Sequence, residues 1–313
     1  MEKPNIKELE SFTLKSYTNL LQYLKQTYKI VPFREAPAKN FPYLILRHDV
    51  DISPLAALKM AQIERDLGIK STYFVMFSNR FYNLFEGNNA HILNQISKLG
   101  HEIGLHYHPF QFRSYNQNMN KTLEIEIKLL EHLLGRKVHS IARHGYWDRD
   151  PFASIKEYIN ANHPYFRGDL FIHDSCRIWT PPEGLNKLLN NHPQRVQLLT
   201  HPENWTEEKM DREILRQKCL KILTKELREG MDRWLKEPSE ISADRSSDIE
   251  SFANRSSMRS GLDAYKPTSK MKLKRELSHY NVLFRWHIVN TSPGWCFHKT
   301  IEKLRFTLKK KVK

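Results

Sequence analysis

The chain has 313 residues, of which 40% are hydrophobic and 27% charged, and its formal net charge is +15. This apolar content is typical of globular proteins and excludes wholesale disorder, and no stretch approaches the roughly 18 apolar residues of a membrane-spanning helix. Three scattered cysteines favour a reducing compartment over a disulfide framework. Because the N-terminus also lacks a signal-peptide pattern, we expect a cytoplasmic protein.

The positive charge is concentrated near the C-terminus. Residues 261–313 contain 13 Lys and Arg against 3 Asp and Glu, a net charge of +10. The remainder of the chain is therefore only mildly basic. A charge distribution of this kind indicates a basic tail rather than a basic body.

Hydrophobic periodicity predicts a leading helix over residues 6–28. From residue 43 onward, the predicted elements alternate between strand and helix. The predicted strands cover residues 43–47, 71–77, 101–107, 138–142 and 195–200. The predicted helices cover residues 54–67, 90–99, 121–134, 151–160 and 207–235, and the first three of these end at Gly68, Gly100 and Gly135. Regular alternation predicts an α/β fold with parallel strands, as a barrel or an open sheet.

Composition divides the chain into four predicted parts. Residues 1–40 form a helical lead-in and residues 41–236 an α/β domain. Residues 237–265 are poor in apolar side chains and rich in Ser, Arg and Asp, which is typical of a linker. Residues 266–313 form the basic C-terminal extension.

Polar and charged side chains follow four of the predicted strands. Since the carboxyl ends of parallel strands meet at one edge of the sheet, these side chains are expected to lie close together. The segments are RHDVD, GHEIGLHYH, ARHGYW and LLTHP, and they supply Asp49, Asp51, His106, His108, Arg143, His144 and His201. Residues two apart on a strand point the same way, so Asp49 and Asp51 can converge, and so can His106 and His108.

Any one of these histidines taken alone is more often a hydrogen-bonded structural residue than a ligand, and a single Asp-x-Asp is also a common turn device. The joint arrangement favours function, because two like charges close together are relieved by a bound cation. A carboxylate with two imidazoles is a ligand set for a catalytic divalent metal. A second carboxylate could accept a proton from water, and a histidine could donate one to a leaving group. The set predicts metal-assisted hydrolysis of an amide or ester.

These segments, in this order between residues 43 and 235, resemble the motifs of the polysaccharide deacetylase family (NodB homology, carbohydrate esterase family 4), with HDSCRIW as its Asp/Trp motif. The resemblance implies a distorted (β/α) barrel. It also implies one divalent ion, zinc or else iron, cobalt or nickel, held by Asp51, His106 and His108. Asp49 would be the base, positioned by Arg143, and His201 the acid, tuned by Asp174.

Two positions depart from the family pattern. Val50 separates the two aspartates, which are usually adjacent, and Phe110 stands where the second metal histidine usually lies, so that His108 is the nearest substitute. His48 is expected to support the pocket from behind rather than to bind the metal.

The resemblance implies a hydrolase that removes an N-acyl (acetyl or formyl) group from a sugar. A cytoplasmic enzyme would meet a nucleotide- or lipid-linked precursor of a cell-surface glycan, and the basic tail could hold it at the inner face of an anionic membrane. One alternative is a degenerate barrel that binds carbohydrate without hydrolysing it. Another is nucleic-acid binding through the tail, which is less favoured because the tail lacks aromatic-interleaved and zinc-ligand patterns.

Overall fold

The computed structural model describes residues 2–36, 42–77, 79–109, 119–145 and 157–235. The predicted linker and basic extension lie outside these residues, as does Phe110. The chain divides into two units, Met1–Met231 and Asp232–Lys313. None of the helices in the described ranges is long and apolar enough to span a bilayer.

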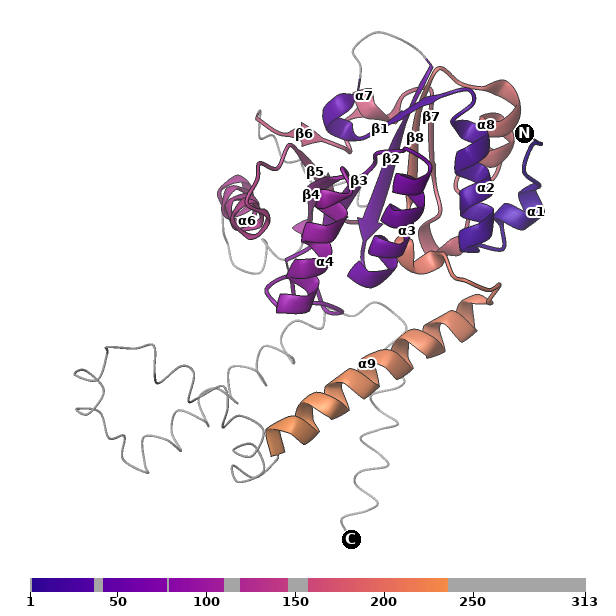
Figure 1. Cartoon of the computed structure of the whole chain (residues 1–313). Helices are drawn as coiled ribbons and strands as arrows, with labels where there is room; N and C mark the ends of the chain where they lie inside the picture. Colours follow the sequence, from indigo (N-terminus) through magenta and orange to yellow (C-terminus); the bar gives the residue numbers. More distant parts are fainter. Residues whose placement is uncertain (1, 37–41, 78, 110–118, 146–156, 236–313) are drawn as a thin grey trace, which may run out of the picture. The chain divides into compact units, whose positions relative to one another are not determined.

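An eight-stranded, wholly parallel sheet forms the centre of the first unit (Figure 1). Its strands are β1 (Lys29–Val31), β2 (Tyr43–Val50), β3 (Thr72–Val75), β4 (Glu102–Tyr107), β5 (Ser140–Arg143), β6 (Ile159–Asn160), β7 (Leu170–His173) and β8 (Arg195–Thr200). The order across the sheet is β6-β5-β4-β3-β2-β8-β7, with β1 pairing beside β2. The predicted α/β class with parallel strands is confirmed, and the sheet forms a half-barrel.

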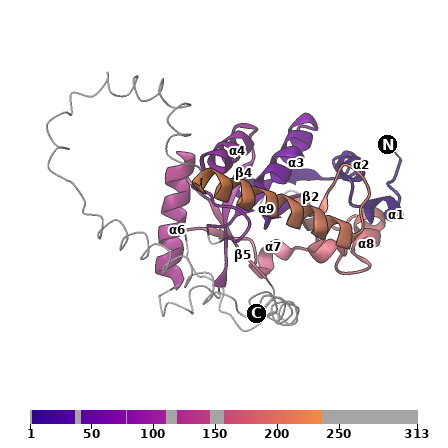
Figure 2. The ribbon, with the colours of Figure 1, turned by 90° about the horizontal axis from the view of Figure 1, so that it is seen from below.

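The helices are α1 (Ile6–Leu9), α2 (Leu14–Leu24), α3 (Pro54–Asp66), α4 (Gly87–Lys98), α6 (Met119–Leu134), α7 (Pro164–Arg167), α8 (Gly184–Asn191) and α9 (Arg212–Leu235). Helices α2, α3, α4 and α6 follow one another along the outside of the sheet (Figures 1 and 2). Their apolar faces and the outward side chains of the strands form two large buried clusters. A third, smaller cluster fills the concave face and includes Tyr43, Ile45 and Phe74.

Local sequence signals explain where α3 begins and ends. The hydroxyl of Ser53 accepts a hydrogen bond from the backbone N–H of Ala56 at 3.2 Å, and Pro54 occupies the first turn. The helix ends before Gly68, which adopts a φ of 69° that side chains with a Cβ rarely tolerate. This start and end agree with the predicted helix over residues 54–67.

The prediction was wrong at three helices. The leading helix is interrupted, because Phe12 has a φ of 51° and Thr13 caps a new helix, α2. The helix predicted from residue 207 begins at Arg212 instead. Of the helix predicted over 151–160, residues 151–156 lie outside the described ranges, whereas Ile159–Asn160 form strand β6. The strands β1 and β7 and the helices α7 and α8 were not predicted.

Gly104 on β4 marks a close approach inside the half-barrel. A Cβ at this position would lie 2.5 Å from Cε1 of Phe74 and 2.8 Å from Oγ of Ser140. Neither a ring nor a buried hydroxyl could stay in place at such distances. Only glycine therefore lets β4 run beside the ring of Phe74, two residues before His106.

Candidate active site

Strand alternation decides which side chains face the concave side of the sheet. On β2, Tyr43 and Ile45 belong to the concave cluster, so Arg47 and Asp49 follow them on the same face. On β4, Gly104 and His106 share that face. The carboxyl ends of β2, β4, β5 and β8 thus bring their polar side chains to one place, as predicted from the parallel arrangement.

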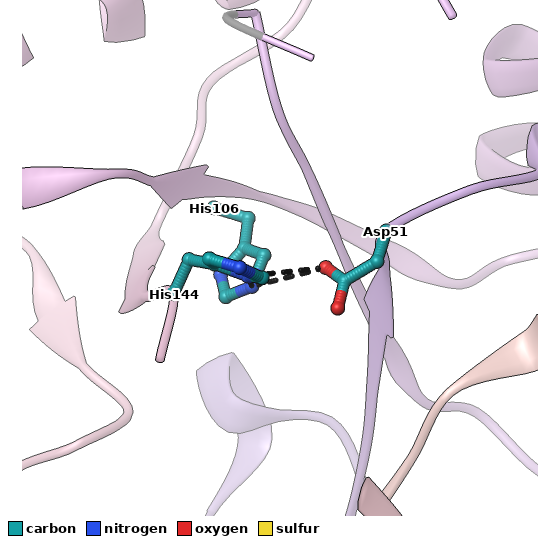
Figure 3. Close-up of side chains that lie close together, drawn as sticks. All are labelled: Asp51, His106 and His144. Carbon is teal, nitrogen blue, oxygen red and sulfur yellow. Dashed lines mark hydrogen bonds and ion pairs between the residues drawn. The ribbon is translucent and has the colours of Figure 1, made fainter. Parts of the chain in front are cut away.

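Three potential metal ligands converge there: Asp51, His106 and His144 (Figure 3). The Nε2 atom of His106 lies 3.2 Å from Nδ1 of His144 and 3.4 Å from Oδ1 of Asp51. The Nδ1 atom of His144 lies 3.3 Å from the same Asp51 oxygen. Burial opposes charge on Asp51, but the two neighbouring imidazoles outweigh it and hold the pKa of this carboxyl well below its usual range.

The spacing of these three atoms fits a metal ion. Zinc lies about 2.0–2.1 Å from nitrogen and oxygen ligands, so the edges of a tetrahedral site measure about 3.3–3.4 Å. The three measured separations, 3.2, 3.3 and 3.4 Å, match these edges. The residues present therefore fit a tetrahedral ion that keeps a position open for another ligand.

His108, the second metal histidine of the sequence prediction, does not belong to this cluster. Its ring centroid lies 5.2 Å from that of His144. Burial, together with the neighbouring imidazoles of His144 and His106, lowers the pKa of His108 to about 4. His108 thus lies beside the cluster as a neutral imidazole, and His144 occupies the place that was expected for it.

Asp49, the predicted base, is held by a guanidinium on its own strand. The Nε and Nη2 atoms of Arg47 donate to the two carboxylate oxygens of Asp49, each at 2.8 Å. Both side chains are buried, and Arg47 also lies over the ring of Phe74. Burial favours a neutral Asp49, but the charge of Arg47 outweighs it and lowers the pKa of this carboxyl.

Arg143 was expected to provide that guanidinium. Strand alternation places it on the face of Ile141, which packs in an outer apolar cluster, whereas Ala142 faces the concave side. The residue that follows β5 on the concave side is His144. The guanidinium that holds Asp49 is therefore that of Arg47.

The predicted pair of His201 and Asp174 is present. Oδ1 of Asp174 accepts hydrogen bonds from the backbone N–H of His201 at 2.9 Å and from its Nδ1 at 2.7 Å. Burial would lower the pKa of His201, but the hydrogen bond and charge of Asp174 raise it to about 10. The other ring nitrogen, Nε2, lies 3.8 Å from Oδ2 of Asp51 and therefore faces the metal cluster.

The sequence prediction did not include Arg47, Glu203 or, as a candidate ligand, His144. Arg47 could have been found from its spacing, because it lies two residues before Asp49 on one strand. Glu203 follows His201 closely, and its Oε2 atom is buried with no hydrogen-bond partner among the described residues. Burial and the nearby charge of Asp51 raise the pKa of Glu203 to about 8, so it adds a neutral carboxyl beside the site at pH 7.

No protein-family model and no curated protein matches the chain in sequence. Among solved structures, it is similar to a CE4 family pseudoenzyme from Bacillus anthracis, at 16% identity over 61% of this chain and 62% of that chain, with a TM-score of 0.37. It is also similar to the chitin deacetylase from the fungal pathogen Colletotrichum lindemuthianum, at 15% identity over 62% of this chain and 86% of that chain, with a TM-score of 0.36.

A third similar structure is a Bdellovibrio bacteriovorus peptidoglycan deacetylase, at 15% identity over 65% of this chain and 54% of that chain, with a TM-score of 0.35. The chain spans 62% of the length of the first of the three.

Proposed function

We propose that this protein is a metal-dependent hydrolase that removes an N-acyl group, acetyl or formyl, from a sugar. One observation carries the proposal. Three ligand atoms at the edge spacing of a tetrahedral metal site lie beside a carboxylate held by a guanidinium and a histidine held by a carboxylate. A ligand set, a base and an acid are the parts that metal-assisted amide hydrolysis needs.

Asp51, His106 and His144 would hold the ion. A divalent ion bound there supplies a Lewis acid that polarises the acyl carbonyl and lowers the pKa of water. One carboxylate and two imidazoles suit zinc, with iron, cobalt and nickel as alternatives.

Asp49 would accept the proton of the attacking water. Its Oδ2 atom lies 3.5 Å from Nε2 of His106, so the carboxylate faces the ligand cluster. The two hydrogen bonds from Arg47 fix the orientation of the carboxylate and keep it ionised.

His201 would donate a proton to the leaving nitrogen. Its Nδ1 is engaged by Asp174, which leaves Nε2 as the atom that faces the site. With a pKa of about 10, the imidazole is protonated at neutral pH, as a general acid must be.

The proposed substrate is an N-acylated sugar linked to a nucleotide or a lipid. The basic extension, which carries most of the net positive charge, would favour anionic carriers, such as a nucleoside diphosphate or a lipid diphosphate, over neutral glycans. The experiment is to measure release of acetate and formate by the zinc-loaded full chain from three acylated sugars: nucleotide-linked, lipid-linked and free oligomeric. Release in the parent and its loss in Asp49→Asn would support the proposal. Binding of a sugar without release of acid would favour the degenerate carbohydrate-binding alternative.

A further inference from the structure

The carboxylate of Asp174 has a second partner besides His201. Its Oδ1 atom accepts both hydrogen bonds from His201, while Oδ2 accepts a hydrogen bond from the indole Nε1–H of Trp205 at 2.9 Å. The side-chain amide of Asn204 donates to the backbone carbonyl of Asp174 at 2.9 Å. Asp174 is fully buried, so these donors replace water around it. The orientation of the carboxylate is therefore fixed by hydrogen bonds to both of its oxygens.

Trp205 is in turn held by aromatic side chains. Its ring centroid lies 5.0 Å from that of Tyr17, 5.3 Å from that of Phe12 and 6.0 Å from that of Trp179. Only 4% of Trp205 is exposed. Tyr17 and Phe12 both belong to the N-terminal segment that the sequence suggests is a separate lead-in. The indole that orients Asp174 thus packs against residues far away in the chain.

Backbone pairing fixes that segment at the site. The N–H of Leu14 donates to the carbonyl of Thr206 at 2.9 Å, and the N–H of Thr206 donates to the carbonyl of Phe12 at 3.0 Å. Phe12 adopts a φ of 51°, which is costly for a residue with a Cβ. Arg177, three residues after Asp174, lies over the Phe12 ring and donates to the carbonyl of Ser11 at 3.1 Å. The surrounding contacts hold Phe12 in this conformation.

We propose that Trp205, held in place by Phe12, is a positioning residue for His201, and that the N-terminal segment is therefore part of the support of the active site. Neither residue contacts the reacting atoms. Trp205 acts through Asp174, which in turn directs Nε2 of His201 toward Asp51. The kinetic part of this inference depends on the proposed role of His201 as the acid, whereas the structural part does not.

The test replaces Trp205 by Phe, which keeps an aromatic ring but removes the N–H donor. Trp179→Phe is the matched control. Trp179 belongs to the same aromatic cluster and is equally buried, but its Nε1 donates to the carbonyl of Leu9 at 3.5 Å and not to Asp174. Both variants lose an indole from the cluster, but only Trp205→Phe loses the hydrogen bond to Asp174.

The kinetic readout compares two substrates of the zinc-loaded full chain. An N-acetyl amide needs a proton on its leaving nitrogen, whereas an acetyl ester of nitrophenol does not. Trp205→Phe should lower kcat for the amide by about 10-fold or more, as expected for a weakened charge-assisted hydrogen bond, and change kcat for the ester by less than about 2-fold. Trp179→Phe should leave the amide-to-ester ratio within about 2-fold of the parent. Equal losses on both substrates in Trp205→Phe would overturn the proposal.

The structural readout needs no activity. Proton NMR of the full chain, without added metal, follows the His201 Nδ1–H in its hydrogen bond to Asp174, assigned by its absence in His201→Gln. The exchange of this proton with solvent should become faster in Trp205→Phe and in Phe12→Ala, and should stay as in the parent in Trp179→Phe. Unchanged exchange in Trp205→Phe would overturn the proposal. If the parent hydrolyses neither substrate, the proposed function fails and this readout alone decides the positioning role.

Discussion

His48 and Thr200 are register partners on β2 and β8, and Nδ1 of His48 lies 2.7 Å from the hydroxyl of Thr200. The residues that follow them, Asp49 and His201, point to the opposite face because side chains alternate along a strand. The proposed base and acid therefore lie on the opposite face of the sheet from this buried hydrogen bond, each one residue beyond it. The contact behind the sheet fixes the register on which the distance between base and acid depends.

Glu64 anchors His48 from helix α3. Its Oε1 atom lies 2.9 Å from Nε2 of His48 and accepts hydrogen bonds from the hydroxyls of Tyr17 at 2.6 Å and Tyr73 at 3.0 Å. Glu64 is fully buried, and burial alone would raise its pKa. The interaction with His48 and weaker contributions from other neighbours outweigh burial. Together they lower the pKa of Glu64 to about 2.

This carboxylate should make stability depend on pH. The pKa of Glu64 lies below its usual value of 4.5, so its contribution is present above pH 4.5 and is lost as the pH falls toward 2. In Glu64→Gln, we expect the free energy of unfolding at pH 7 to fall by about 3 kcal/mol, and this deficit to shrink over that acid range. Urea denaturation of parent and variant at a series of pH values measures it.

The control is Glu213→Gln on α9. Arg216 lowers the pKa of Glu213 to about 2 by a hydrogen bond, but this ion pair is exposed to solvent. Solvent screening makes such a pair contribute little, so this variant should follow the parent at every pH. A Glu64→Gln deficit that stays constant from pH 7 to pH 2.5 would show that the ionised carboxylate is not the source of the effect.

Metal content should distinguish the two possible ligand sets. We expect the full chain to bind about one divalent ion, and Asp51→Ala, His106→Ala and His144→Ala to lose it, because each removes one of three ligands. His108→Ala, the matched imidazole deletion, should keep the ion. Elemental analysis after dialysis against zinc measures the content. Loss of metal in His108→Ala with retention in His144→Ala would restore the ligand set suggested by the sequence.

The base should be separable from the ligands. Asp49→Asn should retain the metal yet lose at least about 100-fold in kcat, because it removes the proton acceptor and leaves the ligands intact. Acetyl-ester hydrolysis and metal content, measured on the same preparation, check this. Near-parental turnover in the variant would exclude Asp49 as the base.

The arginine that positions Asp49 should be identifiable by conservative exchange. Arg47→Lys keeps a positive charge but loses the two parallel hydrogen bonds, so kcat should fall by about 10-fold while the chain stays folded. Arg143→Lys, the matched exchange on β5, should change kcat by less than about 3-fold. Circular dichroism confirms folding, and ester hydrolysis gives the rates. The reverse order of effects would assign the role to Arg143.

The basic extension can be tested with vesicles. Residues 266–313 carry Trp286, Trp295, Phe297 and Phe306 among many Lys and Arg residues, and each charge near an anionic leaflet contributes about 1 kcal/mol. We expect the full chain to sediment with vesicles that contain anionic lipid at low salt, and to be released at high salt. A chain cut after Ser260 should remain in the supernatant. If both chains sediment equally, the extension is not the membrane contact.

The central strands could be predicted from the sequence because they are apolar runs bounded by helix signals. Strand β1 was not predicted because its three residues are too few for a periodic pattern, and β7 was not predicted either. The segment SIAR on β5 is buried along its whole length, so its pattern does not show whether Arg143 or His144 faces the concave side. Arg47 lies two residues before Asp49 on the same strand, so strand spacing alone is enough to bring the two side chains to one face. The contact of Trp205 with Phe12 joins distant segments, which local patterns do not reveal.

Gly104 contributes no atom to the chemistry, yet the site depends on the space that it leaves. A methyl group at this position would overlap the Phe74 ring, and that ring supports the Arg47 guanidinium that holds Asp49. A chain that has every ligand, base and acid could therefore lose its activity through a single Gly104→Ala substitution. Related sequences that keep all the reactive side chains but lack this glycine would be expected to retain the fold and lose the reaction. Whether such a relative is active should therefore be judged from the residue at this position as well as from the reactive groups.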